Sequence, residues 1–309
     1  MSEPVYNDPM RRHDFVLLFD VKDGNPNGDP DAGNLPRLDP ETMQGLVTDV
    51  CLKRKIRDFV DVTHGEEERY KIYVQSKGVA LNSMHKRAYE ALGLKSMGTK
   101  QKRSDVEQVR RWMCLNFYDI RMFGAVMTTE VNCGQVRGPI QLTFSRSIDP
   151  VVPLDISITR VAITREKDAE VVEGEDGLGE GGKVTEMGRK AILPYGLYRG
   201  FGFFSPALAE DTGADAEDLN LFWEALQKMW WQDRSAARGL MECRGVYVFS
   251  HKSTLGEAPA HILFDIVESK LTRKKGVTTP RSIDDYQIPT LEDVREQVPE
   301  GMEVNLLGI

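Results

Sequence analysis

An apolar run that passes directly into a long turn-rich segment constrains the fold of this chain most strongly. Residues 15–21 (FVLLFDV) combine β-branched and aromatic side chains, which is typical of a buried strand. The segment that follows, as far as Asn34, is rich in Gly, Asn, Pro and Asp, which favour tight turns and positive φ. The sequence therefore predicts a buried first strand that ends in a loop.

A helix is expected to begin at Asp39 and Pro40 and to continue to about Val60. Aspartate is favoured as a helix N-cap, and proline is favoured at the first helical position. Apolar side chains spaced three or four residues apart form a stripe along one face of this helix, and cations continue the same line toward its C-terminus. Arg54 and Lys55 lie beside these cations. The residues of the line are Met43, Leu46, Val50, Lys53 and Arg57.

The cationic end of this helix has two interpretations. Basic residues are favourable near the C-terminus of any helix, where they interact with the helix dipole. Alternatively, they form an anion site beneath the turn-rich loop, and the natural polyanion is nucleic acid. The second interpretation requires that Lys53, Arg54 and Arg57 are not bound by carboxylates of their own chain. It also requires that they face a continuous channel between adjoining copies.

The distribution of charge favours one defined nucleic-acid groove over indiscriminate binding. The net charge of the 309 residues is −8, but it is uneven. Residues 41–125 carry 16 Lys/Arg and 11 Asp/Glu, a balance of +5, whereas residues 201–309 carry 11 and 18, a balance of −7. A locally basic surface on an acidic body also suits head-to-tail stacking of copies.

Cysteine and histidine patterns predict neither a zinc site nor a disulfide framework. The four cysteines lack CxxC spacing, and the five histidines lack HxxxH or HExxH spacing. No apolar run approaches the roughly 20 residues of a membrane span, and the N-terminus has no signal-peptide pattern. We therefore expect a reducing, cytoplasmic environment and no metal or other cofactor.

Six segments in the order β-α-β-β-α-β predict an α+β fold of the ferredoxin-like type, which RRM domains share. They are residues 15–21, 42–60, 120–148, 195–204, 215–231 and 245–250. The third segment is expected to hold two strands, at 120–128 and 139–148 around a turn at 132–139, where the fold needs one. Outside this order, we expect a strand at 70–75, helices at 82–92 and 104–118, and strands at 156–164 and 260–267. The structure of residues 284–309 is not predicted.

Residues 199–203 (RGFGF) satisfy the first five positions of the RNA-binding octapeptide of RRM domains. In such domains the aromatic residues stack on bases at the open face of the sheet. The last positions of the octapeptide are not satisfied, so core packing of Phe201 and Phe203 is favoured over base stacking.

The longer motifs resemble one protein family. They are the strand and loop GNPNGDPDAGNLPRLD from Gly24, the helical VTDVCLKRKIR, GPIQLTFSRSI at residues 138–148 and MGRKAILPYGLYRG at residues 187–200. Together they are similar to the RNA-binding backbone subunit of type I-C CRISPR Cascade complexes, a member of the RAMP superfamily. The resemblance covers most of the chain.

The resemblance implies an RRM-like palm over residues 1–60, 119–149 and 194–309. It also implies a helical finger at 61–118 and a β-hairpin thumb at 150–193, whose tip is the acidic, glycine-dense segment 166–183. The implied partners are guide RNA, the target DNA strand paired to it, further copies of the chain and other Cascade subunits. The implied RNA-binding residues are Asn25, Asn27, Arg37, Lys53, Arg54, Arg57, Arg137, Arg189 and Lys190.

A catalytic alternative rests on carboxylates of the first loop. Asp23, Asp29, Asp31 and Asp39 could hold a divalent ion that activates water, as an aspartate does in related RNA-cutting backbone subunits of type III complexes. Aspartate is equally normal in a turn, where it bonds its own backbone. We therefore favour a non-catalytic RNA-binding protein over a metal-dependent ribonuclease.

Overall fold

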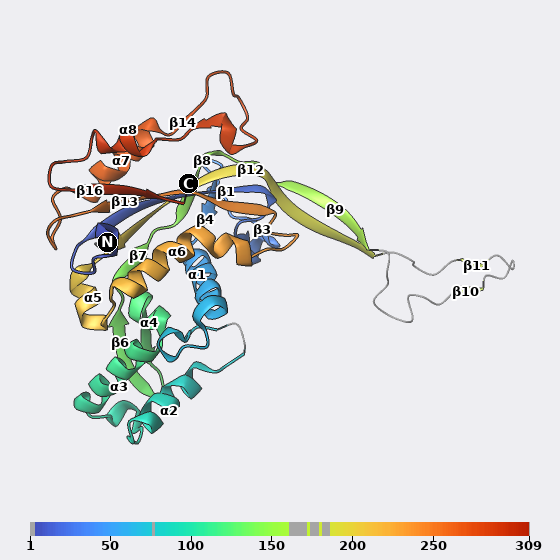
Figure 1. The fold of residues 1–309 in the computed structure, drawn as a ribbon. Helices are drawn as coiled ribbons and strands as arrows, with labels where there is room; N and C mark the ends of the chain where they lie inside the picture. Colours follow the sequence, from blue (N-terminus) through green and yellow to red (C-terminus); the bar gives the residue numbers. More distant parts are fainter. Residues whose placement is uncertain (1–3, 76–77, 161–171, 174–178, 181–185, 309) are drawn as a thin grey trace.

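An antiparallel sheet forms the centre of the computed structural model, which describes residues 4–75, 78–160, 172–173, 179–180 and 186–308 (Figure 1). The strand order of the main sheet is β16-β13-β1-β12-β8-β4, and β7 also pairs with β12. The bounds are β1 His13–Gly24, β4 Gln44–Val47, β7 Ile140–Leu142, β8 Ser145–Pro150, β12 Glu186–Phe204, β13 Leu240–Ser250 and β16 Glu303–Leu307.

Helices cover both faces of this sheet, which explains why the first strand is apolar at almost every position. Phe15, Leu17 and Phe19 point into the core beneath α1 (Asp49–His64) and α6 (Ala216–Gln232). Val16 and Leu18 point into a second core under α7 (Ala260–Lys270) and α8 (Leu291–Arg295). The ferredoxin-like order is confirmed, because β1 lies between β13 and β12, with β7 and β8 on the far side of β12.

The helix α7 corrects the strand expected at residues 260–267. Leu263, Phe264 and Val267 are spaced one, three and four residues apart, so they share one face of a helix, and this face packs on the sheet. The ring of Phe201 stacks on Phe264 at a centroid distance of 4.4 Å, and the Phe203 ring lies 5.7 Å from it. Core packing of the two phenylalanines is therefore confirmed, and base stacking by them on an open sheet face is wrong.

The helix expected from Asp39 begins ten residues later. The Asp39 carboxylate does accept the N–H groups of Glu41 (3.1 Å) and Thr42 (3.4 Å), but in a turn that leads through Met43 (φ 57°) into β4. An aspartate followed by proline marks a turn as readily as a helix start. Helix α1 is instead capped by Thr48, so Met43 and Leu46 lie outside it.

A unit of helices and one hairpin lies to one side of the sheet (Figure 1). Its elements are η3 Glu68–Tyr70, α2 Leu81–Ala91, η4 Gly98–Lys100, α3 Arg103–Asn116, α4 Tyr118–Phe123, β5 Gly124–Thr128 and β6 Asn132–Arg137. The two helices expected at 82–92 and 104–118 are confirmed. The strand expected at 70–75 is wrong, since only a bridge between Lys71 and Phe117 forms there within the part of the chain that is described. The region expected as strand and turn at 120–139 is α4 followed by the β5–β6 hairpin.

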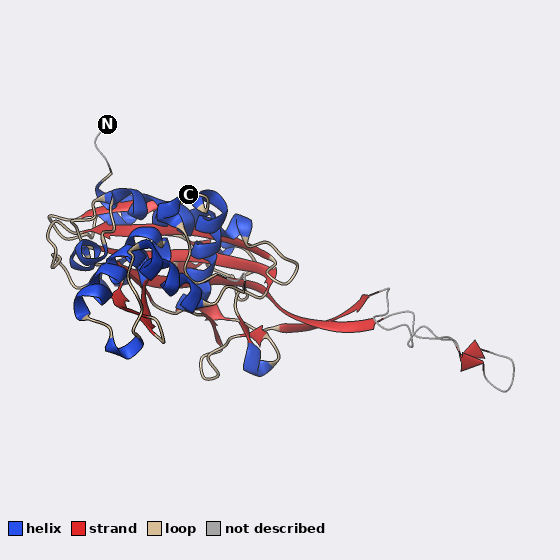
Figure 2. Cartoon of the chain, turned by 90° about the horizontal axis from the view of Figure 1, so that it is seen from below, coloured by secondary structure: helices blue, strands red, loops and turns tan. Residues whose placement is uncertain are grey.

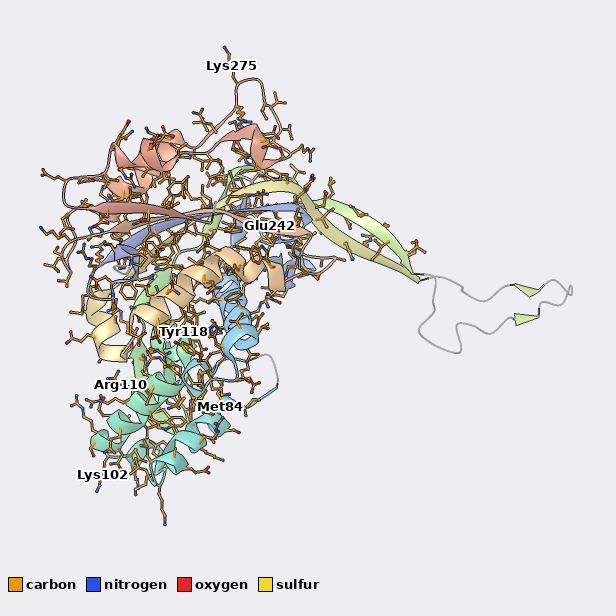
Figure 3. All side chains as sticks on the ribbon, in the orientation of Figure 1. Met84, Lys102, Arg110, Tyr118, Glu242 and Lys275 are labelled. Atoms are coloured by element: carbon orange, nitrogen blue, oxygen red, sulfur yellow. The ribbon has the colours of Figure 1, made fainter. Side chains whose placement is uncertain are left out.

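The same unit has its own hydrophobic core and a polar link to the main body. Its core draws on side chains from Tyr73 to Val136. Tyr118, which lies where α4 meets α6, donates its hydroxyl to the backbone carbonyl of Asp218 at 3.2 Å (Figure 3). Arg121 and Asp218, both almost completely buried, form a 2.7 Å ion pair across the same boundary. The unit is therefore fixed against α6.

A two-stranded ribbon extends away from the rest of the molecule (Figures 1 and 2). It consists of β9 (Leu154–Arg160) and the first part of β12, paired from Leu154 with Ile192 to Arg160 with Glu186. Most of the acidic segment 166–183 lies outside the described residues. Its described parts, Val172–Glu173 (β10) and Gly179–Glu180 (β11), pair with each other.

The remaining elements are short. They are η1 Val5–Asn7, β2 Gly28–Asp29, η2 Pro30–Ala32, β3 Leu35–Pro36, α5 Pro206–Thr212, β14 Thr272–Arg273, η6 Ile283–Asp285 and β15 Tyr286–Gln287. Among the helices that the structure places, none is both long and apolar enough to cross a membrane.

Candidate nucleic-acid interface

A groove of about 690 Å³ lies along the first half of α1, and we call it the α1 groove. Four of the residues expected to bind RNA line it: Asn27, Arg37, Arg54 and Arg57. Arg238, which the sequence did not single out, lines it as well.

The lining of the α1 groove also includes Asp49 and Asp58, and three exposed apolar side chains, Val50, Val74 and Phe144. The groove thus combines guanidinium groups with apolar surface.

The two asparagines of the first loop are structural anchors. Asn25 is 5% exposed, and its side chain donates to the carbonyl of Asn34 at 2.8 Å. The Asn27 side-chain oxygen accepts from the backbone N–H and the hydroxyl of Thr48, both at 3.0 Å. These bonds fix the turn-rich loop against the start of α1. Asn27 borders the α1 groove, whereas Asn25 lies beneath its surface.

Each predicted cation of α1 contacts a carboxylate of its own chain, contrary to the requirement stated for an anion site. Lys53 pairs with Asp49 at 3.0 Å. Arg54 pairs with Asp58, and with Asp233 at 3.1 Å. The side chain of Arg54 is nevertheless 40% exposed, against 15% for Lys53. Arg54 is therefore the helix cation best placed to meet a phosphate.

Arg57 serves mainly to join α1 to the neighbouring helical unit. It is 13% exposed and pairs at 2.8 Å with Asp119, which is 1% exposed. Asp119 also accepts the backbone N–H groups of Tyr73 (2.8 Å) and Val74 (3.1 Å). The Arg57 guanidinium lies 5.4 Å from the centre of the Phe123 ring, and the Lys53 ammonium lies 5.8 Å from it.

Asp233, just after α6, gathers three cations beneath the groove. It pairs with Arg54, with Lys55, and with Arg238 at 3.3 Å. Lys55 is 1% exposed, and burial lowers the pKa of its ammonium to about 7. Arg238 also approaches the carbonyl oxygens of Asn25 (3.5 Å) and Pro26 (3.4 Å). The polar turn between α6 and β13 gave no sequence signal that Arg238 returns to this place.

Arg37 approaches the groove from the loop. Its closest carboxylate is Asp29 at 3.6 Å, and its side chain is 31% exposed. Its buried Nε has no hydrogen-bond partner among the residues that the structure places. Arg37 is thus a loosely paired cation at the groove wall.

The other predicted RNA-binding residues lie elsewhere. Arg137 ends β6 and lines a second cavity of about 610 Å³, together with Phe123. Phe123 also lies under Lys53 and Arg57, and it lines this second cavity but not the α1 groove. Arg189 and Lys190 are on the ribbon, where Arg189 is 79% exposed and 3.5 Å from Asp155.

Two of the four loop carboxylates of the catalytic alternative, those of Asp29 and Asp39, take part in local structure. Asp29 caps the short helix η2 by accepting the N–H of Asp31 at 3.2 Å, and it faces Arg37. Asp39 holds its own turn and pairs with Arg146 at 2.7 Å, contacts that lower the pKa of its carboxyl. Over the described part of the chain, no group of three or more His, Cys, Asp or Glu residues is arranged to hold a metal ion.

Comparisons with known proteins agree with each other. The family model described as "CRISPR-associated protein Cas7" matches residues 11–290. A protein of Haloferax volcanii named "CRISPR-associated protein Cas7" is 28% identical over 240 residues. That match covers 71% of this chain and 65% of the relative, so this chain spans just under two thirds of the relative's length.

A solved structure shows the same fold. A chain of a "CRISPR RNA-guided surveillance complex, pre-nicking" aligns with a TM-score of 0.51 and 13% identity, over 86% of this chain and 84% of that chain. A chain of another "CRISPR RNA-guided surveillance complex" aligns over 86% and 78% with a TM-score of 0.47 and 14% identity.

Proposed function

Because this chain belongs to the Cas7 family of CRISPR-associated proteins, we propose that it is a non-catalytic, guide-RNA-binding backbone subunit of a type I-C Cascade effector complex. The long loop-and-helix motif from Gly24 supports the subtype. The similar solved chain belongs to a CRISPR RNA-guided surveillance complex, and we extend that role to this chain.

The observation that carries the proposal is the α1 groove, where Arg37, Arg54 and Arg238 converge from three separate segments. Guanidinium groups present forked donors that match phosphate oxygens, and such contacts hold RNA without reading its sequence. We assign phosphate binding chiefly to these three arginines, because their side chains remain 31%, 40% and 28% exposed despite their ion pairs, so that a phosphate can compete with the carboxylates. Lys53 and Arg57 would add positive potential beside them, Arg137 would do so from the second cavity, and Asn25 and Asn27 would hold the loop in place.

The body, helical unit and ribbon would act as palm, finger and thumb, with Arg189 and Lys190 near the base of the thumb. Copies would stack head to tail along the guide, since residues 41–125 carry an excess of positive charge and residues 201–309 an excess of negative charge. Target DNA would then be recognised by pairing with the guide, beside other Cascade subunits in the cytoplasm.

Purification with and without nuclease tests this proposal directly. The proposal predicts that the untreated protein carries RNA, seen as a raised ratio of absorbance at 260 nm to that at 280 nm, and elutes as a large assembly. Nuclease treatment should lower the ratio and reduce the size. A nucleic-acid-free monomer or small closed oligomer in both preparations would contradict the proposal.

The non-catalytic part of the proposal has a separate test. Purified protein incubated with single-stranded RNA and Mg²⁺ or Mn²⁺ should leave the RNA intact, because the Asp29 carboxylate already caps η2 and faces Arg37. Cleavage that disappears in Asp29→Ala or Asp31→Ala would show that the loop is a metal-dependent nuclease site instead.

A further inference from the structure

Phe144 is the large aromatic side chain of the α1 groove, and 57% of it is exposed. It lies between β7 and β8, two segments that both pair with β12. Its neighbour Ser145 is completely buried, and Ile140 on β7 is buried as well. The chain therefore turns its bulky aromatic residue outward while a small polar residue points into the protein.

A β-bulge produces this orientation. Leu142 pairs with Gly202 and Arg146 pairs with Arg199, so three residues on this side face two on β12. At the bulge, Thr143 donates its N–H to the Phe201 carbonyl (2.9 Å) and its hydroxyl accepts the Phe201 N–H (3.1 Å). An extra residue in one strand changes the direction in which the side chains beside it point, and here it turns Phe144 outward.

Close packing on the opposite strand fixes the bulge. A Cβ atom on Gly200 would lie 2.3 Å from the Ser145 hydroxyl oxygen, so the glycine is what allows Ser145 to enter the sheet. With Thr143 bonded to Phe201 and Ser145 buried, Phe144 has no place on the inner side. Its exposure is therefore a built feature of the sheet edge.

The surroundings of Phe144 match the two parts of a nucleotide. The apolar side chains of Val50 and Val74, which are 65% and 47% exposed, line the same groove. The groove also holds the guanidinium groups of Arg37, Arg54 and Arg238. An aromatic ring beside cations is the combination that binds single-stranded nucleic acid, because bases stack on the ring while phosphates meet the charges.

We propose that Phe144 is a stacking platform for an unpaired nucleobase of RNA held in the α1 groove. The inference rests on the proposed function, since it takes the groove arginines as phosphate ligands. It adds that the palm itself holds a base, at a place distinct from the phenylalanines Phe201 and Phe203 that pack under α7. Arginines in the lining favour an anionic occupant over an apolar protein segment.

The test measures the affinity of single-stranded RNA for the full chain and its variants by fluorescence anisotropy over a range of salt concentrations. Phe144→Ala should weaken binding roughly 5- to 100-fold, the effect of losing one base–aromatic stack. The dependence of log Kd on log salt should keep its slope, because no phosphate contact is lost. Phe144→Trp should bind at least as tightly as the wild type.

Leu255→Ala is the matched control, since Leu255 is an apolar residue 86% exposed between β13 and α7 and outside the groove lining, and its loss should leave the affinity unchanged. Ultraviolet cross-linking of bound RNA, followed by mass spectrometry of the peptides, should place a cross-link on the peptide that contains Phe144. The melting temperature of Phe144→Ala should match the wild type, which separates binding from folding.

Wild-type affinity in Phe144→Ala would overturn this inference alone and leave the proposed function standing. Loss of self-association in that variant at unchanged RNA affinity would also overturn it, by showing that a second copy of the chain covers the ring. Failure of the wild-type chain to bind RNA would overturn the proposed function and this inference together.

Discussion

The side-chain oxygen of Asn27 accepts two hydrogen bonds from Thr48, the residue that caps α1. The same Thr48 hydroxyl accepts the N–H of Cys51 at 3.2 Å. The turn-rich loop and the helix start are thus one bonded unit, and the orientation of the α1 groove depends on it.

Asn27→Ala should lower the free energy of unfolding by about 1–2 kcal/mol, because it leaves the Thr48 donors without their acceptor. Asn27→Asp keeps an acceptor oxygen at the same place, so it should retain most of the stability. The added negative charge should instead weaken RNA binding. Chemical denaturation and RNA titration of both variants check this pair of outcomes, and an unchanged stability of Asn27→Ala would refute the anchoring role.

Asp58 is predicted to restrain RNA binding by occupying Arg54. The pair is about two-fifths exposed on both sides, so its strength is modest. Asp58→Asn should release Arg54 and remove one repulsive charge from the groove, which raises RNA affinity about two- to five-fold at low salt. Glu90→Gln, on the exposed side of α2, makes the same charge change elsewhere and should have no such effect. A decrease in affinity in Asp58→Asn would show that the carboxylate positions Arg54 for binding.

The buried ammonium of Lys55 should make stability depend on pH. Its pKa is lowered to about 7 in the folded chain, against about 10.4 in an unfolded chain. Between these values the unfolded state holds one more proton, so stability should rise with pH across about 7 to 10, at up to about 1.4 kcal/mol per pH unit. Below about pH 7 both states are protonated and this contribution is constant.

Denaturant titrations of the wild type and Lys55→Met at several pH values isolate that contribution. The stability of the wild type relative to the variant should increase from pH 7 toward pH 10. A difference that stays flat would show that Asp233 keeps Lys55 charged throughout the range, and that burial is fully offset by the ion pair.

The buried first strand and the large amphipathic helix could be predicted from local pattern. Residues 15–21 are apolar on both faces, and α6 carries its apolar stripe at helical spacing, so their structures follow from periodicity. The start of α1 could not be predicted in this way, because an aspartate followed by proline, as at Asp39, suits a turn as well as a helix N-cap. The region that became α7 is a short apolar run, for which periodicity does not separate strand from helix.

The site was predictable as a set of residue types but not as an arrangement. The loop and the α1 cations could be recognised, and Arg37 and Arg54 do meet in one groove. Pairing of Arg57 with Asp119, 62 residues later, and of Arg54 with Asp233 depends on tertiary contacts. For the same reason neither Arg238 nor the outward turn of Phe144 carried a signal in the sequence.

The central claim is that groove arginines bind RNA phosphates, and the salt dependence of RNA affinity tests it most directly. In the double variant Arg54→Gln/Arg238→Gln, the slope of log Kd against log salt should fall by about 1.4, because each of the two lost contacts to single-stranded RNA contributes about 0.7. Arg111→Gln/Arg295→Gln removes the same charge from exposed sites outside the groove and should keep the wild-type slope. A folded groove variant with the wild-type affinity and slope, or an equal loss in the control, would contradict the account.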